Sequence, residues 1–268
     1  VPALKDAGFD ACTTASNHTV DKGFDGLKRT LDVLDANGIR HAGSSRTEQE
    51  RNTPTIMEVK GVKVALLAYG YGLNGFSTPA GKPWAVNLID IPTMLADAKA
   101  ARAAGAQIVA VAVHAGDEYV QLPNAQQRSV ATALAQSGLV DLIYGHHVHV
   151  VQPIDKIGDV WVAYGMGNLI HKQHTAAARA ATQAEALATF TFTEGADGRF
   201  HATAAEARPV AMASTTEPLL HTIDLPTLLA DKSLTGARRT AYQAVYDRSV
   251  KALLALGADT KGLTVVKP

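Results

Sequence analysis

Short apolar segments of strand length alternate with segments of helical period along the first two-thirds of this chain of 268 residues. Residues 108–113 are apolar throughout, which is typical of a strand buried on both faces of a sheet. The segment 92–104 has Pro near its start and Gly directly after its end, which predicts a helix. Alternation of this kind predicts a layered α/β fold. Strands are expected near residues 10–15, 62–69, 108–113, 140–144 and 160–164.

The last third of the chain has a different pattern. Residues 186–193 and 200–207 alternate around a Gly-Ala-Asp-Gly turn and predict a hairpin, and residues 235–256 predict a long helix. The Ala-rich stretch from His171 to Glu185 has no clear period and is interpreted as either a surface helix or a mobile loop. The expected domains are one α/β domain over residues 1–212 and a helical extension over residues 213–268.

Charge and cysteine content narrow the classes of function. Lysine plus arginine and aspartate plus glutamate both number 25, so no basic surplus indicates a nucleic-acid partner. The single cysteine, Cys12, cannot form a disulfide within the chain and is interpreted as a small buried residue of its strand. The apolar run from Ile108 to Val113 is far shorter than the roughly 20 residues of a membrane-spanning helix. The chain opens on Val-Pro rather than Met, and we expect it to be part of a longer protein.

Histidines directly follow three of the expected strands. His18 follows the first, His114 follows the strand over 108–113, and the segment Gly-His-His-Val-His at 145–149 follows the strand over 140–144. Ligands of open α/β sheets gather outside the carboxyl ends of the strands, so these histidines are candidates for one site. A His-x-His pair in an extended segment points both rings to one side, which favours His147 and His149 as metal ligands.

Each of these residues also has a structural interpretation. A lone histidine at a strand end is more often a capping or solvent-facing residue, whereas three histidines in five residues have no packing explanation, because imidazoles bury poorly without partners. Asp21 is either part of the site or merely the cap of a helix that begins near Gly23. The remaining histidines are interpreted as surface or loop residues: His41, His171, His174, His201 and His221.

Four blocks of sequence, in order, resemble those of the bacterial capsule-synthesis family (CapA, poly-γ-glutamate synthesis), which is itself similar to calcineurin-like metallophosphoesterases. The segment 16–23 resembles its Asn-His-x-x-Asp-x-Gly block, and 114–119 its His-x-Gly-x-Glu-Tyr block, with Pro123 and Gln126 following. The segment 145–152 resembles Gly-His-His-Pro-His-Val-x-Gln, with Val148 in place of Pro, and 164–168 resembles Tyr-x-x-Gly-Asn. The resemblance implies a β-sandwich flanked by helices.

The resemblance also implies roles for individual residues. It implies that the Asn17 oxygen binds metal, and that His18 protonates the leaving group or stabilises the transition state. It makes His114, His147 and His149 metal ligands, with Mn, Fe or Zn as the ion preferred by imidazole and amide donors. The position of His146 leaves the register of the last pair open by one residue. The candidates for outer partners or extra ligands are Asp21, Glu118, His146 and Asn168.

One part of the family pattern is missing. The superfamily also uses an early Asp-x-His and a Gly-Asp, and neither Asp6 nor Asp10 has a His two residues on. Neutral ligands alone do not offset the repulsion between two divalent ions, so we expect an incomplete site that holds at most one ion. The family's N-terminal strand is also expected to be missing, which would leave an exposed sheet edge that favours association with another chain.

The sequence and its family resemblance are consistent with two functions of different classes. The first is a metal-dependent hydrolase that acts on a phosphoester, or on a related bond of a cell-envelope polymer. The alternative is a non-catalytic capsule-assembly component that binds an anionic polymer such as poly-γ-glutamate. An amidohydrolase barrel is disfavoured, because its His-x-His lies at the first strand. The resemblance implies an extracellular or cell-envelope location, and we expect neither a nucleic-acid partner nor a transmembrane segment.

Overall fold

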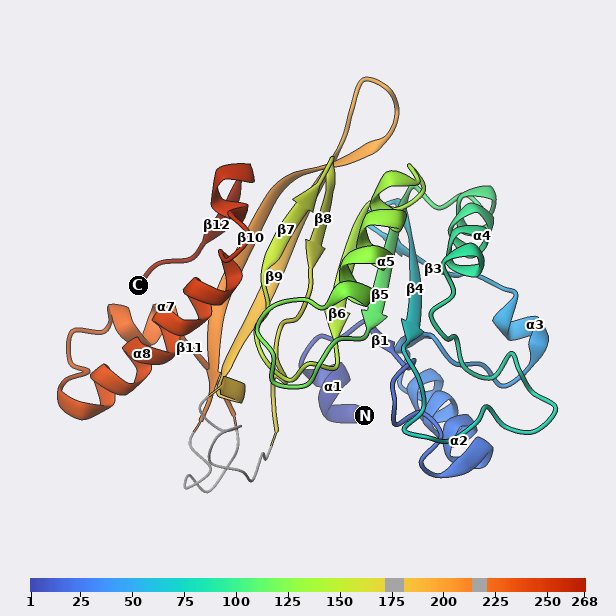
Figure 1. Ribbon diagram of the computed structural model, residues 1–268, viewed down its shortest axis with the longest axis horizontal. Coiled ribbons are helices and arrows are strands. Elements are labelled where there is room, and N and C mark those ends of the chain that lie inside the picture. The colour runs from blue at the N-terminus through green and yellow to red at the C-terminus, as the bar shows by residue number, and fades with distance from the viewer. Residues whose placement is uncertain (172–180, 214–220) are drawn as a thin grey trace. The chain divides into compact units, whose positions relative to one another are not determined.

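The computed structural model of the protein describes residues 1–171, 181–213 and 221–268 (Figure 1). The chain divides into two compact units. The first unit comprises residues 1–115 and 130–143, and the second comprises residues 116–129 and 144–268. Helix α5 (Ala125–Gln136) and strand β6 (Leu142–His146) each begin in one unit and end in the other.

The first unit contains the predicted alternation of strands and helices. Strand β4 pairs with β3 in antiparallel fashion and with β5 in parallel fashion, with Gly70 opposite His114 at the last position of the parallel register. Strands β1 and β2 pair in parallel as a separate two-stranded sheet. The elements of this unit are α1 (Pro2–Asp6), β1 (Ala11–Thr13), α2 (Gly23–Ala36), β2 (Arg40–Ala42), α3 (Glu48–Arg51), β3 (Thr55–Val59), β4 (Val62–Gly70), α4 (Ile91–Ala103) and β5 (Ile108–His114).

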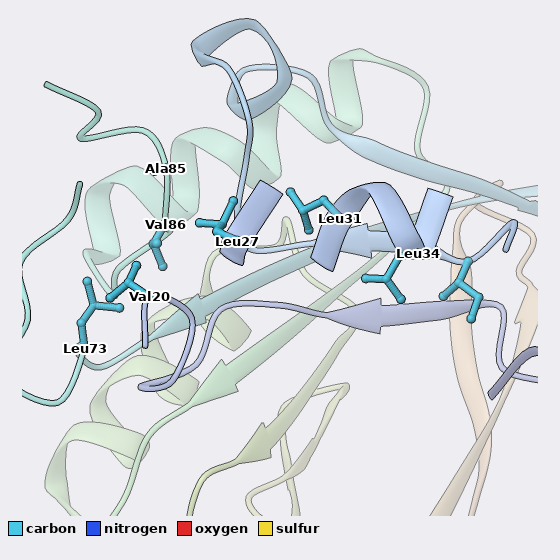
Figure 2. Packing of buried hydrophobic residues seen from close by; sticks show 8 residues of the cluster. Val20, Leu27, Leu31, Leu34, Leu73, Ala85 and Val86 are labelled. Atoms are coloured by element: carbon cyan, nitrogen blue, oxygen red, sulfur yellow. The ribbon is translucent and has the colours of Figure 1, made fainter. Parts of the chain in front are cut away.

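Helix α2 buries one face of leucines at helical spacing. Leu27, Leu31 and Leu34 lie in one cluster with residues of two loops, Val20 and Leu73 (Figure 2). Burying a leucine side chain contributes about 1.5–3 kcal/mol, so this cluster is a main source of stability for the unit. It also fixes the loop before α2 and the loop after β4 against the same helix.

An ion-pair network joins α3 and the loop before it to helices α2 and α4. The Arg46 guanidinium contacts Glu50 at 2.5 Å and Asp35 at 2.7 Å, and Arg51 contacts Asp97 at 2.7 Å. Burial alone would raise the pKa of Glu50, but hydrogen bonds from Arg46 outweigh burial and hold that pKa below its usual value. These groups line a cavity of about 400 Å³, in which the two guanidinium groups are neutralised by carboxylates.

The second unit is built on the long strand β10. It pairs in antiparallel fashion with β9 and β11 and in parallel fashion with β12, and α8 packs on β10 and β9 (Figure 1). Strands β7 and β8 form a hairpin. The elements of this unit are β7 (Ile154–Ile157), β8 (Val160–Ala163), β9 (Ala184–Glu194), β10 (Phe200–Met212), β11 (Thr222–Asp224), α7 (Leu225–Ala230), α8 (Gly236–Leu253), the 3-10 helix η1 (Ala258–Lys261) and β12 (Leu263–Val265).

The mixed α/β class is as predicted, and every expected strand is present within two residues of its expected start. Within residues 221–268, for which a helical extension was expected, the structure also contains two strands of three residues each, β11 and β12. Strands this short give no periodic signal in the sequence. The boundary between domains at residue 212 stays a prediction.

Residues 172–180 of the Ala-rich stretch, including His174, lie outside the described residues. No helix within the described ranges is long and apolar enough to cross a membrane.

Candidate functional site

In the first unit, Asn17 and His114 meet. His114 is the last residue of β5, and Asn17 lies in the loop after β1. The Nε2 atom of His114 lies 2.8 Å from Oδ1 of Asn17, whose side chain is buried. Two ligands that each lie about 2.1 Å from one ion, near a right angle, are about 3 Å apart. As a hydrogen bond, this contact places a proton on Nε2, because the amide oxygen can only accept. Once that proton is released, the separation of the oxygen and the nitrogen fits two neighbouring ligands of one divalent ion.

A residue that the sequence did not indicate holds Asn17 in place. The Nδ2 group of Asn17 donates to Oδ1 of Asn74 at 3.0 Å, and the hydroxyl of Tyr71 donates to the same oxygen at 3.3 Å. Both residues lie in the Gly- and Pro-rich loop after β4. The one local signal is the asparagine itself, since Asn74 has a φ of 50°, a conformation that asparagine tolerates better than most residues.

His18 and Asp21 form a second pair on the same loop as Asn17. Nδ1 of His18 lies 2.7 Å from Oδ2 of Asp21, so the carboxylate accepts the Nδ1 proton and leaves Nε2 for other chemistry. The His18 side chain is 65% exposed, which suits a group that meets a ligand from solvent. The capping interpretation of Asp21 is wrong: α2 begins at Gly23 with Lys22 as its N-cap, and no side chain caps it.

In the second unit, His149 is held by two neighbours. Its Nδ1 lies 2.6 Å from Oδ1 of Asn168, and its ring stacks on Tyr119 with 5.7 Å between centroids. Its Nε2 lies 3.9 Å from Oε1 of Glu118. The amide oxygen can only accept, so Nδ1 carries the proton and Nε2 keeps the lone pair that a metal requires.

The two histidines of the His-x-His pair have an unusual backbone. His147 has a φ of 93° and His149 a φ of 61°, in the region that residues with a side chain rarely adopt. Their ring centroids are 6.3 Å apart. Strained backbone of this kind concentrates at functional sites, where the surrounding structure maintains it. The conformation of the segment thus supports the predicted role of these histidines.

Buried amides hold the loops around His149. Gln127 donates through Nε2 to Oε1 of Gln152 at 2.8 Å, and Gln152 donates to the Val120 carbonyl at 2.9 Å. Gly116 leaves no room for a side chain, because a Cβ would lie 2.4 Å from Val148. Gln126, which the resemblance matched without assigning it a role, is exposed, and the buried amide is that of its neighbour Gln127.

Three other histidines differ in burial from simple surface residues. His41 was predicted to be a surface or loop residue, but it lies in β2 and its side chain is only 9% exposed. Burial lowers the pKa of His146 to about 4, and its ring meets Tyr144 edge to face. His171 was predicted to be a surface or loop residue, but its side chain is only 11% exposed. Its Nε2 lies 2.9 Å from the Thr182 carbonyl and 3.7 Å from Oε1 of Glu185. Glu185 is fully buried, which the undifferentiated Ala-rich sequence around it did not indicate.

The candidate ligands therefore occur as pairs within each unit. Across residues 1–171, 181–213 and 221–268, no group of three or more His, Cys, Asp or Glu is placed to hold a metal ion. The expectation that Asn17, His18, His114, His147 and His149 converge at one end of a sheet joins residues of both units, and it stays a prediction. The roles of Glu118, His146 and Asn168 as extra ligands also stay predictions.

Sequence comparison assigns the family of this α/β protein with amide and imidazole groups at its strand ends. The profile of the family described as bacterial capsule synthesis protein PGA_cap matches residues 1–173, so the chain belongs to that family. The PGA biosynthesis protein CapA of Bacillus subtilis (strain 168) is 32% identical over 209 residues, which cover 76% of this chain and 52% of that protein. The capsule biosynthesis protein CapA of Bacillus anthracis is 28% identical over 176 residues, 65% of this chain and 43% of that protein. The chain thus spans about half the length of the curated relatives it matches.

The solved structures that align with this chain are more distant in sequence. The NAD nucleotidase NadN of Haemophilus influenzae aligns with a TM-score of 0.49 and 15% identity, covering 98% of this chain and 49% of that chain. The calcineurin-like phosphoesterase YfkN of Bacillus subtilis aligns with a TM-score of 0.47 and 14% identity, covering 95% of this chain and 74% of that chain.

Proposed function

We propose that this chain is the ligand-bearing part of a metal-dependent hydrolase that cleaves a phosphoester, or a related bond, in the production of capsule polymer. One observation favours it most: the contact between Oδ1 of Asn17 and Nε2 of His114, next to the His18–Asp21 pair on the same loop. Family membership supports the link to capsule polymer. Because the chain spans about half of its relatives, the substrate and the activity of the whole protein are part of the proposal.

The residues have distinct tasks in this proposal. Oδ1 of Asn17 and Nε2 of His114 are the candidate ligands in the first unit, and His147 and Nε2 of His149 are the candidate ligands in the second. When bound, such an ion supplies Lewis acidity and a water of lowered pKa. Asp21 accepts the Nδ1 proton of His18, and Nε2 of His18 gives a proton to the leaving oxygen.

The ligands named here carry no negative charge. Amide and imidazole donors suit Mn, Fe or Zn, but they do not offset the repulsion of a second divalent ion. We therefore propose that this chain binds at most one ion tightly. Two carboxylates contact these groups: Asp21 lies 2.7 Å from Nδ1 of the proposed acid His18, and Glu118 lies 3.9 Å from Nε2 of the candidate ligand His149.

Hydrolysis of bis-p-nitrophenyl phosphate by the full chain tests the proposal. Activity is expected with Mn²⁺ and not with EDTA, and His114→Ala is expected to remove it. His201→Ala is the matched control, because His201 is exposed and contacts Asp197 in the β9–β10 turn. If the chain hydrolyses no phosphoester but retains poly-γ-glutamate on a column, it is the non-catalytic polymer-binding component instead.

A further inference from the structure

The orientation of the Asn17 amide decides whether the first unit offers an oxygen ligand beside His114. The oxygen of the amide attracts a cation, whereas its NH₂ group repels one. Both orientations fill the same space, so the hydrogen-bond partners of the amide select between them. In the structure Nδ2 of Asn17 points to Asn74, and Oδ1 faces Nε2 of His114.

Asn74 is itself held by a second donor. The Tyr71 hydroxyl lies 3.3 Å from its Oδ1, and the Tyr71 ring is parallel to that of His114, with 5° between the planes and 6.5 Å between the centroids. The backbone N–H of Tyr71 also donates to the His114 carbonyl at 2.9 Å. One short segment thus contacts both Asn17 and His114.

A third contact of Asn74 is weaker. Its Nδ2 lies 3.5 Å from Nδ1 of His18, at the outer limit of a hydrogen bond. Asp21 lies 2.7 Å from the same nitrogen and accepts its proton, so that nitrogen has no lone pair for Asn74. The effect of Asn74 is therefore on Asn17 rather than on His18.

The segment that contains Asn74 is held in place by the buried side chain of its neighbour Leu73. Leu73 is buried in the same cluster as Val20 and Leu27, so the loop that contains Asn74 and the loop that contains Asn17 pack on one core (Figure 2). The side chain of Asn74 is exposed, but its backbone is held at a φ of 50°. Asparagine and glycine are the residues that adopt this conformation with the least strain.

We propose that Asn74 is a positioning residue, which holds the Asn17 amide with Oδ1 turned toward His114 and thereby creates a cation ligand. The proposal rests on the proposed function for the class of ligand, a divalent cation. It adds to that function a residue outside all four blocks of the family resemblance.

Two substitutions separate the effect of the Asn74 side chain from the effect of its backbone conformation. Asn74→Gly keeps the positive φ without strain but removes the amide. Asn74→Asp keeps an oxygen that can only accept, so it still binds Nδ2 of Asn17. Ser77→Gly, at an exposed position of the same loop, is the matched control for added flexibility. The measurements are the side-chain NH₂ resonances of Asn17 in metal-free protein and the Kd for Zn²⁺ by calorimetry.

In Asn74→Gly we expect the Asn17 resonances to move toward those of a free amide and the Kd for Zn²⁺ to rise about 10-fold or more, as is usual when a partner of a ligand is lost. Asn74→Asp and Ser77→Gly are expected to keep a bonded Asn17 amide and at least wild-type affinity. The proposal is overturned if Asn74→Gly leaves both measurements unchanged, or if Asn74→Asp loses as much as Asn74→Gly. If the unaltered chain binds no Zn²⁺, the proposed function fails, and the Asn17 resonances alone decide the role of Asn74.

Discussion

Nδ1 of His149 lies 2.6 Å from Oδ1 of Asn168, and this contact determines which ring nitrogen remains available to a metal ion. The amide oxygen accepts the Nδ1 proton, so Nε2 keeps its lone pair. The amide of Asn168 also reaches the carbonyl of His149 at 3.5 Å, which turns its oxygen toward the ring. The loop after β6 that contains His149 and the loop after β8 that contains Asn168 are thus joined through the candidate ligand.

Replacing Asn168 is expected to weaken metal binding without removing a proposed ligand of the ion. Asn168→Leu leaves Nδ1 without its acceptor and frees the ring to rotate, so Zn²⁺ affinity is expected to fall about 10–100-fold. Asn168→Asp keeps the acceptor and is expected to bind Zn²⁺ at least as tightly as the unaltered chain. Calorimetric titration of both variants makes the comparison. Equal affinity in Asn168→Leu and wild type would exclude this role for Asn168.

Removing a ligand and removing the proposed acid are expected to differ. His149→Ala is expected to abolish metal-dependent activity and to lower metal content, with the thermal midpoint nearly unchanged, because the residue lies on a loop. His18→Ala is expected to slow turnover about 10²–10⁴-fold while metal content stays near normal, since its role is proton transfer. Metal analysis beside turnover separates the two. Equal loss of metal in both variants would mean that His18 is a ligand and not the acid.

The bounds of a strand were predictable from the sequence where the strand is buried along its whole length. They were not predictable where the close packing of two backbones determines where the strand ends. Strand β5 is apolar along its whole buried length and was located to within one residue. Strand β6 was expected over 140–144 but runs from Leu142 to His146. Gly145 and His146 have low strand propensity, yet a Cβ at Gly145 would lie 2.0 Å from the Tyr164 carbonyl oxygen. A close approach of two backbones therefore extends the strand through a glycine, and no periodic pattern signals this.

The candidate ligands were recognisable because chemistry and position coincide at the ends of strands. Two of the residues that contact the candidate site residues, Asp21 and Asn168, were also indicated, because they lie inside the blocks of the family resemblance. Asn74, Gln127 and Glu185 were not, because they lie in segments whose polar side chains look like ordinary surface residues until the fold brings distant loops together. Gln127, for example, meets Gln152 across 25 positions of sequence. Long-range hydrogen bonds of this kind have no local signature in the sequence, and the role of the candidate ligands themselves stays a prediction.

Gly116 supplies a test of how tightly the loop before α5 packs. An added Cβ would lie 2.4 Å from Val148 and 2.6 Å from Oε1 of Gln127, and the backbone φ is 121°. Gly116→Ala is therefore expected to lower the free energy of unfolding by about 1–3 kcal/mol through backbone strain and overpacking. Gly138→Ala is the matched control: its φ of 69° also disfavours alanine, but nothing lies within 4 Å of its Cβ. Chemical denaturation that gave equal losses in both variants would show that the contacts with Val148 and Gln127 have no effect.

Glu185 is expected to make stability depend on pH in a direction unusual for a carboxylate. It is fully buried, and its Oε1 lies 3.7 Å from Nε2 of His171. Burial raises its pKa to about 8, against a smaller lowering by the backbone of Leu169. Between its ordinary pKa of 4.5 and about 8 the folded state therefore holds a proton that the unfolded state has released.

Folding that binds a proton is weakened as pH rises, so the contribution of Glu185 is complete below pH 4.5 and is lost progressively up to about pH 8. The slope is at most about 1.4 kcal/mol per pH unit. His171 acts in the opposite sense: burial lowers its pKa, so its contribution is lost as pH falls below 6.5. Glu185→Gln removes the first effect and keeps the second. Its free energy of unfolding is expected to exceed that of the unaltered chain at pH 8 and to approach it at pH 5, measured by urea denaturation. If the difference in free energy of unfolding between the two proteins stayed constant from pH 5 to pH 8, Glu185 would already be ionised in the folded state over that range.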